Sequence, residues 1–343
     1  MEKTILEDVS PLGNVQAVVE CDGRTCYFYL NGADDIDFGM RSVWVRNLVT
    51  APEELDVAAM RRGDPPLNPR RHCRSPAGSK PPRENELRVV WLPEGNGAAL
   101  LESNEIIAAI PPWSGENGFY GYARDAVGDG PVAWELATAD AFIARIKDAE
   151  WFTKEWADGD PWPALRDRLV QSISSQLGQH SNYYGIDGGY WPPRAMLRIP
   201  RDGSTVFLTA GMCILPQPNA DELEGGGRRV ELGAVLPSSW SNEEVVKFGR
   251  YISGQAGLPW SRLTWLGHGH TIPCDSWKNP KFTSAILVNN HPAIGTVDMG
   301  EYHGDRIMPL WFLPITAAET ERAIAHGSAT LLRELEGTRW ERA

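Results

Sequence analysis

The segment WLGHGHTIP, residues 265–273, is the stretch around which the second half of the chain is organised. We interpret it as the end of a strand, because Gly and Pro interrupt both helix and strand patterns. An apolar run, SAILVN (284–289), follows it and predicts a buried strand. Upstream, Ser241 and Glu244 form a capping box, which predicts the start of a helix. The segment therefore lies between a capped helix and a strand.

Strands and helices come in groups on both sides of this segment. RVELGAVL (229–236) and IMPLWFL (307–313) predict strands, and Pro309 indicates an edge or a bulge in the second. Thr316 and Glu319 cap a closing helix. The apolar face of that helix is predicted to carry Ala323, Ile324, Leu331, Leu332 and Leu335. Because the strands do not alternate one by one with helices, we expect an α+β fold, a mixed or antiparallel sheet packed by helices.

A long helix and a hairpin precede these elements. Asp160 caps the helix, Pro161 takes its first position, and Gly178 ends it. Residues 194–199 and 205–214 flank Asp202-Gly203, a turn signal that predicts a hairpin.

The first half of the chain is rich in strand signals. Residues 14–30 predict a hairpin around Asp22-Gly23. Further strands are predicted at 42–49, 87–92 and 98–110, and helices at 52–61 and 138–150. The 343 residues suit two domains of about 150 residues each. We expect a β-rich α+β domain at 1–150 and a second α+β domain at 151–343.

Charge and cysteine content narrow the class of protein. The net charge is −12, which disfavours nucleic acid as a partner and attracts a basic one. The five cysteines are sparse and odd in number, and they predict neither a disulfide framework nor a CxxC metal knuckle. The start of the chain does not resemble a signal peptide, and no apolar run is long enough to span a membrane. We expect a cytoplasmic protein.

Residues 267–275, GHGHTIPCD, contain side chains that zinc accepts as ligands. In an extended strand His268 and His270 point to the same face, and Cys274 follows. A complete site needs another ligand, for which the candidates are Asp298, His291 and His303. Nothing in the sequence brings them close, so we expect no metal and no cofactor. A metal-dependent hydrolase using this segment is the alternative, although the G-x-S-x-G, HExxH and Walker A motifs are missing.

Several tryptophans lie near the predicted ends of elements, in loops with Pro, Ser and Gly. At such places a tryptophan either anchors a partner or closes the edge of the core. The candidate partner-binding residues are Trp240, Trp260, Trp265, His268, His270, Asp275 and Trp277.

Four segments, in order, resemble the suppressor-of-fused domain. They are RRVELGAVLPSSW (228–240), WLGHGHTIP (265–273), SAILVNN (284–290) and IMPLWFLPITAAETERAIAHGSATLLRELE (307–336). The matching features are an acidic-apolar strand followed by Leu-Pro and Trp, the Gly-His-Thr-Ile stretch, and a strand that runs into Pro-Ile-Thr and a helix with an acidic start. The resemblance covers roughly residues 161–335.

This resemblance implies an α+β fold for the second domain and no catalysis. In animals the family's regulator binds a transcription factor through an added peptide strand. Bacterial members resemble immunity proteins that neutralise a partner toxin, or other binding proteins. The long C-terminal domain of the animal regulator has no counterpart in this sequence, which favours the bacterial type.

We therefore expect a non-catalytic, suppressor-of-fused-like (SUFU-like) protein that binds another protein. An immunity protein directed against a basic toxin or peptide is the leading candidate. The oligomeric state stays open, and no peptide-contacting residue carries over from the family.

Overall fold

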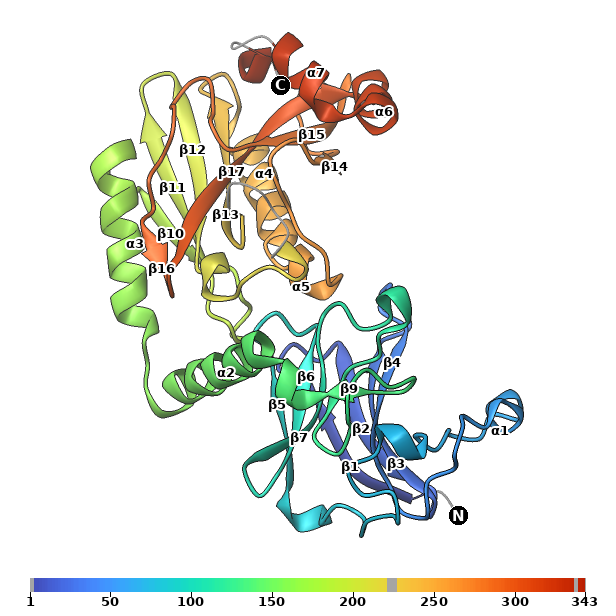
Figure 1. Ribbon diagram of the computed structural model, residues 1–343. Helices are drawn as coiled ribbons and strands as arrows, with labels where there is room; N and C mark the ends of the chain where they lie inside the picture. The colour runs from blue at the N-terminus through green and yellow to red at the C-terminus, as the bar shows by residue number, and fades with distance from the viewer. Residues whose placement is uncertain (1–2, 221–226, 336–338, 343) are drawn as a thin grey trace. The chain divides into compact units, whose positions relative to one another are not determined.

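The computed structural model describes residues 3–220, 227–335 and 339–342. Two compact units make up the chain: unit 1 is Met1–Gly159 with Ser261–Leu263, and unit 2 is Asp160–Trp260 with Thr264–Ala343. Strands and helices lie in separate groups, which confirms the predicted α+β fold (Figure 1). The expected division after residue 150 falls inside the helix Asp140–Asp158, and the domain assignment stays a prediction.

Unit 1 contains two sheets. Its strands are β1 (Lys3–Val9), β2 (Val15–Cys21), β3 (Thr25–Gly32), β4 (Met40–Asn47), β5 (Leu87–Trp91), β6 (Ala98–Glu102), β7 (Glu105–Ile110), β8 (Tyr122–Ala123) and β9 (Trp134–Glu135). The first sheet has the order β1-β2-β3-β4 and the second β5-β6-β7-β8-β9. Phe28 and Trp44 of the first sheet share one core with Leu100 of the second. Since neighbouring residues of a strand face opposite sides, Leu101 packs instead with Ile146 of α2 (Asp140–Asp158).

The first predicted helix of unit 1 is shorter than expected. Residues 52–61 were expected to be helical, but α1 is Val57–Arg61. The Asp56 side chain accepts a hydrogen bond from the Ala59 N–H, so the helix begins there and not at Pro52.

Unit 1 also holds a disulfide that the cysteine count did not predict. Cys21 and Cys26 are bonded at the end of the β2–β3 hairpin. The register of this hairpin places the two residues directly opposite each other, with Cα atoms 4.2 Å apart. The other cysteines, Cys73, Cys213 and Cys274, are free and buried. The predicted hairpin is confirmed, and the cytoplasmic location stays a prediction.

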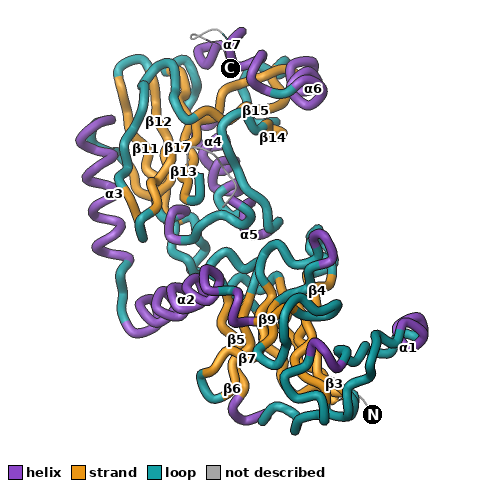
Figure 2. The backbone as a smooth tube through the Cα atoms, viewed as in Figure 1, coloured by secondary structure: helices purple, strands orange, loops and turns teal. Residues whose placement is uncertain are grey.

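Unit 2 is organised around one mixed sheet (Figure 2). Its strands are β10 (Asn182–Gly185), β11 (Ala195–Arg201), β12 (Ser204–Ala210), β13 (Arg229–Pro237), β14 (Thr271–Pro273), β15 (Phe282–Val288), β16 (Glu301–Tyr302) and β17 (Asp305–Thr316). The order is β10-β11-β12-β13-β17-β15-β14, with β16 paired to β17. β13 and β17 are parallel, and the other neighbouring pairs of this sheet are antiparallel. β10 and β14 are therefore the two open edges.

The helices of unit 2 follow the sequence signals with one exception: Pro161, and not Asp160, takes the N-cap position of the first helix, and no side-chain hydrogen bond caps it. They are α3 (Trp162–Leu177), α4 (Asn242–Gln255), α5 (Leu258–Ser261), α6 (Ala317–His326) and α7 (Ser328–Glu334). Both predicted capping boxes, at α4 and α6, are present. No helix in the described part of the chain is long and apolar enough to cross a membrane.

The closing helix is divided in two. Gly327, with a φ of +80°, separates α6 from α7. The predicted apolar face does not all face the core: Ala323 and Leu331 are buried, whereas Ile324 is 75% exposed. Ala323 is the buried residue of α6, and the next residue, Ile324, lies on the exposed side of this helix.

Candidate functional site

A buried glutamine holds the start of the segment 265–273. The Gln217 side chain accepts a hydrogen bond from the Leu266 N–H at 2.8 Å and donates one to the Leu266 carbonyl at 3.0 Å. Just before it, the Pro216 carbonyl accepts a hydrogen bond from the Trp260 indole at 2.8 Å. Because both backbone groups of Leu266 are satisfied from outside the segment, its position is fixed without a neighbouring strand.

A tight turn follows. The His270 N–H donates to the Gly267 carbonyl at 3.1 Å, and the Gly269 N–H donates to the Leu287 carbonyl at 2.8 Å. Gly269 has a φ of +87°, and a Cβ atom there would collide with Ser328 at the start of α7. Glycine is therefore required on both grounds.

This turn corrects the predicted placement of the histidines. They were expected to share one face of an extended strand, but His268 lies in the turn and is exposed. His270 is half-buried and packs on Trp265, with ring centroids 4.1 Å apart. Burial lowers the pKa of both histidines.

On its open side, the edge strand β14 has one residue whose N–H and carbonyl groups both point away from β15. His270 and Cys274 hydrogen-bond to β15 through the His270 carbonyl and the Cys274 N–H. In an antiparallel pair such residues alternate with residues that point outward, so Thr271 and Pro273 face the open side. Proline has no N–H, and the Pro273 carbonyl accepts a hydrogen bond from the Tyr251 hydroxyl at 2.7 Å. The open edge is thus short and centred on Thr271.

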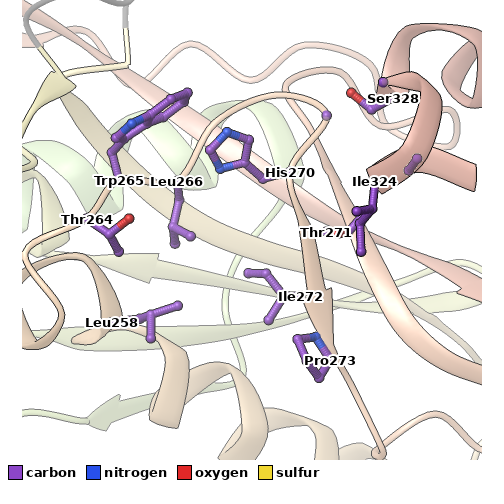
Figure 3. A pocket seen from close by; sticks show the side chains of 13 residues that line it. Leu258, Thr264, Trp265, Leu266, His270, Thr271, Ile272, Pro273, Ile324 and Ser328 are labelled. Carbon is purple, nitrogen blue, oxygen red and sulfur yellow. The ribbon is translucent and has the colours of Figure 1, made fainter. Parts of the chain in front are cut away.

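A pocket of about 520 Å³ lies along β14. In Figure 3, Ile272 points toward the side of Leu258 and Leu266, and Thr271 points toward Ile324 of α6. The other side chains that line it are Thr264, Trp265, His270, Pro273, Ala323 and Ser328. His270 is the one titratable group of this lining, and the rest are apolar or carry a hydroxyl.

The structure separates the candidate partner-binding residues into three groups. Trp265 and His270 line the pocket. His268 and Asp275 are exposed nearby in the chain but outside the lining. Trp240, Trp260 and Trp277 are buried in the core. Ring contacts join Trp240 and Trp277 to each other, and the Trp277 indole donates to the Ser284 carbonyl.

The other half of the pocket was not predicted from the sequence. Leu258 comes from α5, just before residues 265–273 in the chain, and Ile324 comes from the distant α6. The one available signal was the apolar residue at 324, and the helical periodicity assigned it to the core. Gln217 carried no signal, because its role depends on a contact with residue 266.

The described residues contain no group of three or more His, Cys, Asp or Glu side chains that could hold a metal ion. Cys274 is buried, and burial raises the pKa of its thiol to about 11, which disfavours the thiolate that a metal requires. Asp298 lies beside α3, where its carbonyl accepts a hydrogen bond from Ser172. His303 lies in the turn before β17.

His291, the remaining ligand candidate, is completely buried between aromatic rings. Its ring lies 6.0 Å from that of Trp311 and 5.9 Å from that of Trp340, and its Nδ1 accepts a hydrogen bond from the Ala293 N–H at 3.1 Å. Burial lowers its pKa to about 4.

This burial predicts an acid-sensitive unit 2. A histidine whose folded pKa lies below its unfolded value of about 6.5 stabilises the fold above pH 6.5, and this contribution is lost as the pH falls toward 4. His291→Asn removes the titration and keeps an acceptor for the Ala293 N–H. We expect the free energy of unfolding of wild type, relative to this variant, to fall by about 3 kcal/mol between pH 7.5 and pH 4. Urea unfolding across this range measures it, and a constant difference would contradict it.

Comparison with known proteins gives one family match. Residues 191–341 match the family model described as Suppressor of fused protein (SUFU). A solved structure described as the Sufu-Fu complex crystal structure is similar to this chain at 17% sequence identity and a TM-score of 0.32, over 52% of this chain and 86% of that chain. The chain matches no curated protein.

Proposed function

Since unit 2 carries a suppressor-of-fused-like domain, we propose that this protein binds an extended segment of another protein along β14 and performs no catalysis. The observation that supports this most directly is the combination of an open strand edge with an apolar pocket beside it. Strand addition at such an edge draws affinity from main-chain hydrogen bonds and specificity from side-chain pockets.

The open edge defines the register of the bound segment. The Thr271 N–H and carbonyl point outward and form one pair of hydrogen bonds with the incoming strand. Pro273 and the hydrogen bond from Tyr251 close the edge two residues further along. The segment therefore pairs at one position, and a shift by two residues finds no second pair.

The pocket defines the side chain that the segment inserts. Its lining has no lysine, arginine or carboxylate, and burial lowers the pKa of His270, so this ring is neutral at pH 7. Transfer of a charged side chain into such surroundings is unfavourable. The partner places an uncharged apolar or aromatic residue here, against Trp265 and Ile324.

The partner that we propose is a toxin, and this protein is its cytoplasmic immunity protein. The observation that supports it is the net charge of −12, which accelerates encounter with a basic protein. The alternative of a metal-dependent hydrolase receives no support from the positions of His268, His270 and Cys274.

A charge placed in the pocket tests the binding mode. Ile324→Asp introduces a carboxylate into the lining, and we expect it to weaken binding of the partner by about 30-fold, the effect of losing roughly 2 kcal/mol at a hot spot. Ala325→Asp is the matched control, because it adds the same charge to an exposed neighbouring position of α6 that does not line the pocket.

The partner is obtained by affinity purification from the native host at several salt concentrations, and its affinity for each variant is measured by calorimetry. Hydrogen exchange of residues 269–273 should slow on binding. Equal affinities of the two variants would exclude the β14 pocket as the binding site. Failure of any protein to copurify at any salt concentration would remove the basis of the proposal.

A further inference from the structure

The opposite edge of the unit 2 sheet is also open. β10 pairs with β11 alone, and the Ile186 N–H donates to the Arg194 carbonyl at 2.8 Å just beyond the strand. By the alternation of an antiparallel pair, Tyr184 faces β11 with its backbone groups, while those of Tyr183 and Gly185 point outward. The β10 edge therefore has two residues whose N–H and carbonyl groups point outward, whereas the β14 edge has one.

This edge has little of the protection that sheet edges usually carry. The strand sequence is NYYG, without proline, lysine or any other charge. Its tyrosine Tyr183 is 41% exposed, and Tyr190 and Trp191 in the following loop are 77% and 37% exposed. Exposed aromatic residues grouped around an unpaired edge are typical of contact surfaces for other proteins.

An apolar pocket of about 290 Å³ lies beside β10, between the sheet and α4. Tyr184, Met196 and Phe207 form its sheet side, and Val246 and Gly249 form its helix side. Gly249 makes room for it: a Cβ there would lie 3.1 Å from the Phe207 ring and 3.3 Å from the Met196 methyl group. A side chain on the α4 face of a strand added to β10 would lie over this pocket.

The charge beside the pocket is positive. Arg250 lines it, is exposed, and makes no ion pair with any residue in the described ranges. Arg198, which pairs with Asn182 of β10, donates to the Asn242 amide oxygen at 2.9 Å. The nearby carboxylate of Asp187 accepts hydrogen bonds from the N–H groups of Gly189 and Arg194 within its own loop. Arg250 thus gives the border of an apolar pocket a positive charge in a protein of net charge −12, and Arg198 lies two residues from the lining residue Met196 on β11.

From these features we infer that the β10 edge is a second docking surface, which binds an extended segment of a protein partner that carries carboxylates next to an apolar residue. The segment pairs with the outward groups of Tyr183 and Gly185. Its apolar side chain enters the pocket against Met196 and Phe207, and a carboxylate pairs with Arg250. This surface is distinct from β14, and its occupant has the opposite charge preference to the basic partner proposed there.

Selection from a displayed library of random 12-residue peptides tests this inference. The full chain with Ile324→Asp serves as bait, so that binding at β14 is already impaired. We expect the enriched peptides to combine acidic residues with an apolar one. Synthetic copies of them are then measured by calorimetry against further variants of the same bait.

Two pairs of variants locate the binding. Tyr183→Pro removes an outward N–H that the sheet itself does not use, and Tyr183→Ala removes only the ring. Arg250→Glu reverses the charge at the pocket, and Arg250→Gln only neutralises it. We expect Tyr183→Pro to weaken binding at least tenfold more than Tyr183→Ala, and Arg250→Glu more than Arg250→Gln. Circular dichroism and thermal unfolding confirm that each variant is folded.

Selected peptides without acidic residues, or peptides that bind Tyr183→Pro and Arg250→Glu as tightly as their controls, would overturn the inference. So would a library that yields no peptide dependent on these residues. None of these results affects the β14 proposal, which is tested separately by comparing the affinities of Ile324→Asp and Ala325→Asp for the native partner.

Discussion

Glu231→Ala lowers the free energy of unfolding of unit 2 by about 3–5 kcal/mol, because it leaves several buried donors unpaired. Glu231 lies on the central strand β13 and is completely buried. Its carboxyl group accepts hydrogen bonds from the Thr209 hydroxyl at 2.6 Å and from the N–H groups of Gly211 and Cys213 at 2.8 and 3.0 Å. A cavity at the same place adds to the loss.

Glu231→Gln is the matched variant. Its amide oxygen accepts from the same two backbone N–H groups, and burial already raises the pKa of the glutamate, so the uncharged replacement is well tolerated. We expect this variant to lose about 1 kcal/mol. Urea unfolding, with hydrogen exchange of residues 206–215 as a local readout, measures both. Equal losses would contradict this expectation, because Gln fills the same volume as Glu and keeps an acceptor for both N–H groups.

In unit 1, Arg46→Ala should cost about 3 kcal/mol, because it removes the buried guanidinium group between two buried carboxylates and leaves them the more exposed guanidinium groups of Arg83 and Arg124. Arg46 on β4 donates to Glu102 at 3.2 Å, and its Nε lies 3.1 Å from a carboxylate oxygen of Asp125. It also donates to the Lys80 carbonyl at 3.2 Å, which attaches the long segment between α1 and β5. All three charged side chains are less than 15% exposed.

The pH dependence of the unfolding free energy distinguishes this loss of charge pairing from a loss of packing. Burial alone would raise the pKa of Glu102, but the hydrogen bond from the Arg83 N–H and the charges of Arg46 and Arg124 outweigh it, and the pKa is lowered. A carboxyl with a lowered pKa stabilises the fold above its unfolded value, and this contribution is lost as the pH falls through the folded value.

The difference in unfolding free energy between wild type and Arg46→Ala should therefore shrink below about pH 4. Arg46→Lys, which keeps the charge but not the planar fork, should fall between the two. Urea unfolding monitored by hydrogen exchange in β4 and β6 gives the measurement. A difference that persists unchanged at low pH would assign the loss to packing.

Sequence patterns predicted the elements whose signals are local. The capping boxes at Ser241 and Thr316 and the hairpin turns at Asp22-Gly23 and Asp202-Gly203 are all present, because each depends on residues only a few positions apart. Pro309 was expected at an edge or a bulge, and it lies where β17 pairs with β13 before the pairing with β15 begins.

The candidate site depended on contacts between distant residues, and there the sequence was a weaker guide. Trp240, Trp260 and Trp277 resembled Trp265 in their surroundings along the chain, yet only packing decides that the first three are buried. Helical periodicity placed Ile324 in the core, because it does not show which side of α6 packs against the rest of the protein. The Cys21–Cys26 disulfide was not predicted either, because it depends on the register of a hairpin and not on the number of cysteines.

The parallel pairing of β13 with β17 means that the centre of the unit 2 sheet is completed late in synthesis. All of α4, α5, β14 and β15 lie between the two strands in the chain, yet β17 is the direct neighbour of β13. While the ribosome makes this intervening chain, β13 has β12 on one side and nothing on the other. A nascent sheet with such an unfilled position is prone to pair with other chains. The protein thus passes through an aggregation-sensitive stage that ends when β17 leaves the exit tunnel and completes the centre of the sheet.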